Sequence, residues 1–409
     1  METRFIDLCK KGDLIGLQQL LELYPNINIS AKNEKAIRFA CFRGHLDVAQ
    51  WLLQIKPDIE LSVLNEDVFR TACLHGHLDV CQWLLQVKPD IDISAENDRM
   101  FRIACENGHL DVAQWLLRVK PDIDISAENE KVFRYACERG HLDVAQWLLQ
   151  VKPTIDISAF NEYAFRWACI HGHLDVCQWL LQVKPDINIS VYSEEAFCFA
   201  CSSGHLEVAQ WLLQVKPDIN ISSNNEYAFC YTCKNGHLDV AQWLLQIKPD
   251  INISIYNEQA FRYACLNGHL HVCQWLLQVK PTIDISAFNE YAFRWACSFG
   301  HLEVAQWLLQ VKPTINISAE DEEAFRDAWN LGYFQVVQWL QSLKPYLYVI
   351  EYDENGHFKG YKIRSKEEAN WQHRKYLVWL ASNHCPEENK TNLLYKLPSD
   401  VSRMVIGFV

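Results

Sequence analysis

The chain has few basic side chains for its 409 residues. Lysine and arginine together number 38, against 51 aspartates and glutamates, and the formal net charge at pH 7 is −13. Proteins that bind nucleic acids or anionic membranes do so through concentrated basic patches. We therefore expect neither a nucleic acid nor a membrane among the partners of this protein.

Long apolar runs are missing as well. No stretch approaches the roughly 18 apolar residues that a membrane-spanning helix needs. The chain opens with Met1-Glu-Thr-Arg-Phe-Ile, which places an acidic residue where a secretory leader has a basic region and then an apolar one. These absences predict an unsecreted, cytoplasmic protein.

Catalytic signatures are absent from the sequence too. It contains no glycine-rich phosphate-binding loop, no Gly-x-Ser-x-Gly nucleophile turn and no carboxylate pair that stands outside its repeat pattern. We therefore expect no enzyme activity and no cofactor.

A regular repeat dominates what the sequence does contain. Glycine recurs every 32 residues, at positions 12, 44, 76, 108, 140, 172, 204, 236, 268, 300 and 332, and proline recurs at the same spacing from Pro25 to Pro345. A fixed period of roughly 20 to 50 residues is typical of a solenoid, in which each repeat buries its apolar surface against its neighbours. The sequence therefore predicts about eleven stacked repeats.

Each repeat is predicted to contain two helices. In the repeat around Gly76, Asn65 suits a helix N-cap, Glu66 suits the first turn, and the glycine suits a left-handed C-terminal residue. The second helix, about residues 78–87, is apolar around most of its circumference and must contact several neighbours. Glu66 and Arg70 are expected to pair on an exposed face.

These residues resemble a known family. The core Ala-x-x-x-Gly-His-x-x-Val and Leu-Leu pattern of ankyrin repeats is similar to Ala72, Gly76, His77, Val80, Leu84 and Leu85. The resemblance implies an all-α, ankyrin-type helix-turn-helix solenoid that serves as a non-enzymatic protein-protein interaction scaffold and binds a protein partner on its concave face. The repeats look most like the ankyrin arrays of large DNA viruses of protists.

Three departures from the family pattern affect the expected fold. The repeat has 32 residues rather than about 33, the Thr-Pro-Leu-His start is replaced by strings such as Asp67-Val-Phe-Arg70, and the Asp-Gly of the hairpin tip is missing. Stacked helices are therefore expected in preference to projecting β-fingers. We predict a monomer with an array over residues 1–345, in which residues 1–32 are a capping repeat and residues 320–345 are the last repeat.

Cysteine and histidine recur at fixed positions of the repeat, and such residues could form disulfides or bind metals. Stacked helices lie about 8–10 Å apart, too far for disulfides between equivalent cysteines of successive repeats. The same spacing argues against zinc at the pairs Cys198/Cys201 and Cys230/Cys233. We therefore predict no metal, interpret the cysteines as buried thiols of a protein in a reducing compartment, and interpret the repeated histidine as a brace for the turn.

Aromatic residues vary from repeat to repeat near the start of the first helix, and they are the candidate partner-binding residues. They are Leu64, Phe160, Tyr163, Tyr192, Tyr227, Tyr256, Phe288 and Tyr291. As binding anchors they would supply large contact area at a low entropic cost. The alternative is that the large residue before the cap is a hydrophobic staple onto the phenylalanine five positions later. The residue after the repeated arginine, such as Trp167, is interpreted as packing between repeats.

The repeat pattern ends after Pro345. Residues 347–352 and 358–363 predict a β-hairpin and residues 365–381 an amphipathic helix, so that residues 346–385 would form a cap. Residues 386–409 are predicted to be a linker and a short terminal helix that resembles the opening Leu-Pro helix of an F-box. Its expected docking residues are Leu397, Pro398, Val401, Val405 and Phe408. The resemblance suggests a second function, a substrate-recruiting adaptor of a host cullin-type ubiquitin ligase; alternatively, the helix seals the last repeat.

Overall fold

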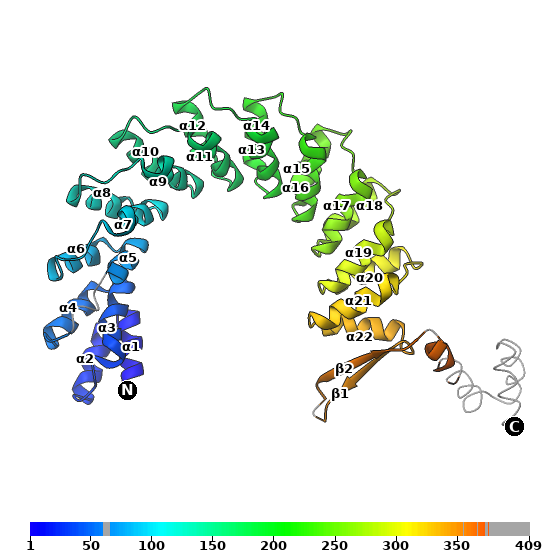
Figure 1. Ribbon diagram of the computed structural model, residues 1–409, viewed down its shortest axis with the longest axis horizontal. Coiled ribbons are helices and arrows are strands. Elements are labelled where there is room, and N and C mark those ends of the chain that lie inside the picture. Colours follow the sequence, from blue (N-terminus) through cyan, green and yellow to red (C-terminus); the bar gives the residue numbers. More distant parts are fainter. Residues whose placement is uncertain (60–65, 355, 366, 373–374, 376–409) are drawn as a thin grey trace, which may run out of the picture. The chain divides into compact units, whose positions relative to one another are not determined.

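The computed structural model describes residues 1–59, 66–354, 356–365, 367–372 and 375. The chain folds as two compact units. The N-terminal unit holds Met1–Thr232 and His237–Ile251, and the C-terminal unit holds Cys233–Gly236 and the described residues from Asn252 onward. Within the described residues, both units consist of paired helices, and a single hairpin follows the last pair (Figure 1).

Two helices form each repeat, as the sequence predicts. The first helices are α1 (Glu2–Lys11), α3 (Ala31–Phe42), α5 (Glu66–Leu74), α7 (Ala95–Glu106), α9 (Ala127–Glu138), α11 (Ala159–Ile170), α13 (Val191–Ser202), α15 (Ser223–Lys234), α17 (Ile255–Leu266), α19 (Ala287–Ser298) and α21 (Ala319–Asn330). The second helices are α2 (Leu14–Leu23), α4 (Leu46–Ile55), α6 (Leu78–Val87), α8 (Leu110–Val119), α10 (Leu142–Val151), α12 (Leu174–Val183), α14 (Leu206–Val215), α16 (Leu238–Ile247), α18 (Leu270–Val279), α20 (Leu302–Val311) and α22 (Phe334–Leu343).

The core lies between successive repeats. In most first helices, a buried phenylalanine contacts the tryptophan of the next repeat's second helix, 46 residues further on, as in Phe133 and Trp179, whose ring centroids are 6.2 Å apart. In α3 this position is Ile37. The same contact recurs in both units, for example between Phe69 and Trp115 and between Phe293 and Trp339. Because this apolar surface is covered by a different repeat, an isolated repeat would leave it in water.

The repeated histidine braces the turn of the preceding repeat, which confirms the interpretation from sequence. The Nε2–H of His45 donates to the carbonyl oxygen of Lys10 at 3.1 Å. Gly12 lies under that ring: a Cβ at Gly12 would be 2.5 Å from Nδ1 of His45, and φ is +69°. The glycine is therefore required both for its left-handed backbone and for the close approach of the histidine.

The start of the first helix differs from the N-cap predicted for it. The Asn129 position has a left-handed backbone with φ of 56°, and so do the residues on either side, Glu128 and Glu130. The side chain of Arg134 reaches back over this turn, where Nε donates to the carbonyl of Asn129 at 2.8 Å and Nη2 donates to that of Glu128 at 3.1 Å. Arg166, Arg262 and Arg294 brace their own turns in the same way.

The expected exposed Glu66–Arg70 pair is also wrong. Arg70 pairs with Asp67 at 2.7 Å instead. In the repeat of α11, Oε1 of the equivalent Glu162 accepts from the backbone N–H of Asn188 at 3.4 Å and Oε2 accepts from the hydroxyl of Ser158 at 2.7 Å. This glutamate is buried, and it ties one repeat to the next, which local i,i+4 spacing does not reveal.

The predicted hairpin is present at the end of the array. β1 (Tyr348–Tyr352) pairs antiparallel with β2 (Phe358–Ile363), and Tyr348 is opposite Ile363. The ring of Tyr348 stacks on Phe325 of α21 with centroids 4.0 Å apart, and its hydroxyl donates to Glu322. Tyr348 thus covers the last buried phenylalanine of the array, where a tryptophan would come from a following repeat.

The start of the predicted helix after the hairpin has a reciprocal capping box. The backbone N–H of Glu368 donates to Oγ of Ser365 at 3.1 Å, and the N–H of Ser365 donates to the Glu368 carboxylate at 3.1 Å. Helical backbone follows over 367–372. The rest of this predicted helix reaches beyond the described residues.

We expect Tyr348→Ala to destabilise the C-terminal unit by about 2–4 kcal/mol, because it uncovers Phe325 and leaves a cavity. Urea unfolding followed by tryptophan fluorescence measures this loss. Tyr352→Ala in the same strand is the control, since Tyr352 is 48% exposed, and it should cost about 1 kcal/mol or less. Equal effects of the two changes would contradict the capping role of Tyr348.

Stability is expected to fall as the pH drops below about 6.5. Burial lowers the pKa of His77, His141, His173, His205 and His301 from its ordinary value of 6.5. The unfolded chain therefore binds more protons in the window from pH 6.5 down to the folded pKa values, and protons favour unfolding there. The same contribution to stability is fully present above pH 6.5.

Thermal melts between pH 7.5 and 6.0 test this dependence. This range avoids the opposite effect of Glu106 and Glu130, whose pKa values burial raises from 4.5. His141→Asn should flatten the slope of melting temperature against pH, because it removes one of the half-buried imidazoles. A slope that is the same in both proteins would exclude His141 as a source of the pH dependence.

Candidate functional site

The first helices provide the surface on which the candidate residues lie. Within the N-terminal unit, α5, α7, α9, α11 and α13 pack against one another in succession. Figure 1 shows α9, α11 and α13 on the inner side of this unit's curve and α10, α12 and α14 on its outer side. Residues at the start of the first helices and on their solvent-facing side therefore share one face of the unit.

The aromatic residues of the left-handed turn are exposed. The exposed fraction is 56% for Phe160 and Phe288 and 57% for Tyr192 and Tyr256. Each of these residues has a positive φ between 49° and 60°, which turns the side chain away from the helix that follows. Phe165, the staple partner expected five positions after Phe160, is fully buried and contacts Trp211, so the exposed ring of Phe160 is not its staple.

Three of these exposed rings lie over bracing arginines of the preceding repeat. The guanidinium carbon of Arg134 is 4.5 Å from the centroid of Phe160, that of Arg166 is 4.8 Å from Tyr192, and that of Arg262 is 4.5 Å from Phe288. One face of each ring is held by a cation that is itself hydrogen-bonded to backbone, and the other face is available.

The second group of candidates is half-buried and forms stacked columns along the helices. Tyr163 stacks on Trp167 with centroids 5.4 Å apart, and Trp167 stacks on His171 at 5.6 Å. Tyr227 stacks on Tyr231 at 4.1 Å. The ring of Tyr291 is 5.4 Å from Trp295, which is itself 5.4 Å from Phe299.

These columns change the interpretation of the residue after the repeated arginine. Trp167 and Trp295 are half-exposed, so they extend the aromatic surface as well as packing between repeats. His171 and Phe299 belong to the same columns and were not among the sequence candidates. Their spacing of four from the tryptophan was the available signal, because residues four apart share one face of a helix.

The aromatic surface formed by residues 153–169 occurs a second time in the chain, and each copy is called an aromatic module below. Residues 153–169 are identical to residues 281–297, and the contacts repeat with the sequence. Arg134 lies 4.7 Å from Tyr163, and Arg262 lies 4.7 Å from Tyr291. The first copy is in the N-terminal unit and the second is in the C-terminal unit.

The two copies differ in the charge beside the tyrosine. In the first copy, the hydroxyl of Tyr163 donates to Glu138 at 2.6 Å. Burial together with this carboxylate raises the pKa of Tyr163 well above its ordinary value. Leu266 stands at the equivalent position in the second copy. The two modules therefore offer the same rings in a more acidic and a more apolar setting.

Three cysteine pairs meet inside single repeats, which sequence reasoning about successive repeats had missed. The Sγ atoms of Cys73 and Cys81 are 3.6 Å apart, those of Cys169 and Cys177 are 3.2 Å apart, and those of Cys265 and Cys273 are 3.3 Å apart. All six are buried free thiols, as expected for cysteines that serve as small apolar side chains.

The thiols considered for zinc are buried as well. Burial raises the pKa of Cys198 and of Cys230 to about 12, and the thiolate is the form that binds a metal. In the part of the chain that the structure describes, no group of three or more His, Cys, Asp or Glu side chains is arranged to hold a metal ion. Over the same residues, no helix has the length and apolar character of a membrane span.

The remaining sequence candidates lie outside the described residues. Leu64 falls in the gap at 60–65, and Leu397, Pro398, Val401, Val405 and Phe408 fall in 376–409. The prediction of a terminal F-box-like helix therefore stays a prediction from sequence.

Comparison with known families matches nearly the whole array. The family model described as ankyrin repeats, three copies, matches residues 5–97, 69–161, 101–193, 133–223, 197–289 and 261–346. These matches overlap and cover residues 5–346 without a gap. A comparison with curated proteins gives no match.

Proposed function

Because the chain belongs to the ankyrin-repeat family, we propose that it is a non-enzymatic scaffold that binds a protein partner on the concave face of its repeats, through aromatic anchors on the first helices and their turns. Ankyrin repeats are protein-protein interaction modules, and the choice of face and anchors is our inference. The observation that carries it is the set of rings at Phe160, Tyr192 and Phe288, exposed by more than half of their surface and held over arginines.

Exposed aromatic rings in fixed orientations are suited to binding. Burying such a ring in an interface removes a large apolar area from water and costs little side-chain entropy when the ring is already held. Here the holding group is a guanidinium fixed by two backbone carbonyls, as for Arg134 beneath Phe160.

The stacked columns would extend the anchors into a continuous surface. The column of Tyr163, Trp167 and His171 lies on or directly after the helix of Phe160, and the column of Tyr291, Trp295 and Phe299 lies on or directly after the helix of Phe288. Tryptophan and tyrosine dominate the energy of most protein interfaces. We infer that each module is one hot spot for the partner.

We expect replacing both exposed phenylalanines, Phe160→Ser with Phe288→Ser, to reduce recovery of the partner about tenfold or more. Crosslinking of the full chain in the cells that produce it, followed by quantitative mass spectrometry, measures recovery. The matched control is Val151→Ser with Val279→Ser on the second helices, where the exposed fractions are 44% and 46%. If both double variants lose the same proteins, or neither loses any, the assignment of the partner to the first-helix face is wrong.

A second candidate function, from the sequence alone, is recruitment of substrates to a host cullin-type ubiquitin ligase. It rests on Leu397, Pro398, Val401, Val405 and Phe408 following an ankyrin array and on the likeness of the repeats to viral ones. In this arrangement, the array would hold the substrate and residues 397–409 would dock the ligase.

A chain ending at Asn392 tests this second function. We expect the full chain to recover the ligase adaptor in a pull-down and the shortened chain to recover about a tenth as much or less. Recovery of the array's own partner should be the same for both chains. Equal recovery of the adaptor by both would exclude the terminal helix as a docking element.

A further inference from the structure

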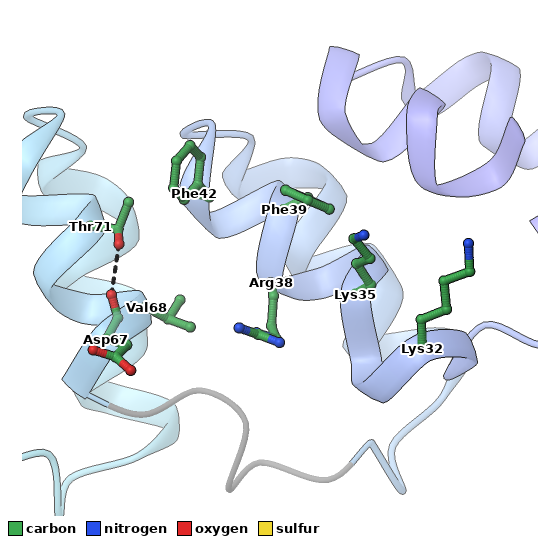
Figure 2. Close-up of a pocket in the computed structure, with 8 residues that line it drawn as sticks. All are labelled: Lys32, Lys35, Arg38, Phe39, Phe42, Asp67, Val68 and Thr71. Carbon is green, nitrogen blue, oxygen red and sulfur yellow. Dashed lines mark hydrogen bonds between the residues drawn. The ribbon is translucent and has the colours of Figure 1, made fainter. Parts of the chain in front are cut away.

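A pocket at the start of the array has a chemistry that the aromatic modules lack. It lies between α3 and α5 within the N-terminal unit and has a volume of about 400 Å³. Figure 2 shows Lys32, Lys35, Arg38, Phe39 and Phe42 along α3 and its left-handed turn on one side, and Asp67, Val68 and Thr71 of α5 on the other.

Cations surround aromatic rings in this pocket. The Nζ atom of Lys35 is 5.2 Å from the centroid of Phe39, and Nζ of Lys10 from the preceding repeat is 4.6 Å from the same ring. The guanidinium of Arg43 lies 5.5 Å from Phe42. These contacts hold positive charge beside an apolar floor, since an ammonium or guanidinium is attracted to the face of an aromatic ring.

The pocket's only carboxylate among its lining residues is already neutralised. Asp67 accepts from Arg70 at 2.7 Å, and the hydroxyl of Thr71 donates to the backbone carbonyl of Asp67 at 2.7 Å, as Figure 2 shows. The pocket therefore keeps a net positive character.

This charge is specific to the first full repeat. In the repeats of α7 and α9, Arg99 and Lys131 take the place of Lys35, and each pairs with a glutamate three residues earlier, Glu96 and Glu128. In α3 the position of that glutamate is Lys32. The substitution replaces a neutralising partner by a second cation.

The start of the chain, which contains this pocket, has an excess of basic residues, whereas the rest of the chain has an excess of acidic ones. Residues 1–43 carry seven Lys and Arg against five Asp and Glu, whereas the rest of the chain carries 31 against 46. A basic pocket at one end of an acidic protein attracts acidic segments over the length of its field and repels them elsewhere. Charge complementarity therefore favours an acidic ligand for this pocket.

We propose that this pocket binds an acidic segment of a partner protein, with carboxylates against Lys32 and Lys35 and one apolar side chain on Phe39 and Phe42. The carboxylates supply charge complementarity, and the apolar side chain supplies burial against the rings. The proposal deepens the proposed function by giving the chemistry of one part of the partner. It uses none of the residues of the two aromatic modules.

Fluorescence polarisation with the full chain tests the proposal. The probe is a labelled peptide of about twelve residues made of Asp and Glu with one central Phe; comparison peptides carry Lys in place of the acids, or Gly in place of Phe. We expect binding of the first peptide, at least fivefold weaker binding without Phe, no binding of the lysine peptide, and weakening with salt because exposed charges are screened.

The matched variants are Lys32→Glu with Lys35→Glu, and Lys131→Glu at the position of α9 equivalent to Lys35. We expect the double variant to lose affinity at least tenfold and Lys131→Glu to change it less than twofold. Phe39→Leu should weaken binding of the Phe peptide and leave the Gly peptide unchanged. Circular dichroism confirms that each variant is folded.

Three outcomes would overturn the proposal. One is equal affinity of the double variant and the unchanged chain for the acidic peptide. Another is tighter binding of a single-stranded RNA oligonucleotide than of the peptide, which would assign the pocket to phosphates. The third is self-association in light scattering that Lys32→Glu with Lys35→Glu abolishes, which would assign it to a second copy. The capture experiment with Phe160 and Phe288 is independent of all three, so the proposed function can stand if the pocket fails.

Discussion

The contact between a phenylalanine of one repeat and a tryptophan of the next is the constraint on which the rest of the structure depends. Phe133 and Trp179 make it in the middle of the array, and the same pair of positions makes it along both units. The contact joins residues 46 positions apart, so each repeat that makes it completes its core with a side chain of its neighbour. It also sets the register of the stack, because glycine and histidine of successive repeats, such as Gly12 and His45, must then meet at van der Waals distance. The array ends where the Tyr348 ring substitutes for the missing tryptophan.

A core that depends on so few positions leaves others free to vary, and the variable positions lie together on the first helices. The left-handed turn is the device that exposes them. It lifts Phe160 and Phe288 out of the core and sets them over arginines of the preceding repeat, which the carbonyls of that repeat's turn hold. The arginine therefore has two roles: it stabilises a backbone conformation that non-glycine residues rarely adopt, and it orients an aromatic anchor of the neighbouring repeat.

Charge adds a second level of variation to the same scaffold. The repeats of α7 and α9 pair their cations with glutamates, whereas the repeat of α3 presents Lys32 and Lys35 together beside Phe39. A protein of net charge −13 thus keeps one basic pocket at its start and aromatic modules further along. A partner with an acidic segment and an apolar surface would bind both the basic pocket and the aromatic modules. Binding at several sites on one chain raises the overall affinity without requiring a strong contact at any single site.

The periodicity of the sequence was enough to establish the paired helices, the turn glycines, the histidine brace and the hairpin after Pro345, because each follows from spacing or from the backbone preference of a residue such as Gly76. The left-handed turn could not be foreseen in this way: Asn129 is equally suited to an N-cap, and what excludes the cap is the bond from Arg134 together with a buried glutamate that binds the next repeat. The setting of the Phe160 ring over Arg134 likewise depends on a residue of the preceding repeat, and the meeting of Cys73 with Cys81 depends on how the two helices of one repeat pack. Local patterns specify which conformations a segment can adopt, and contacts between segments distant in the chain select one of them.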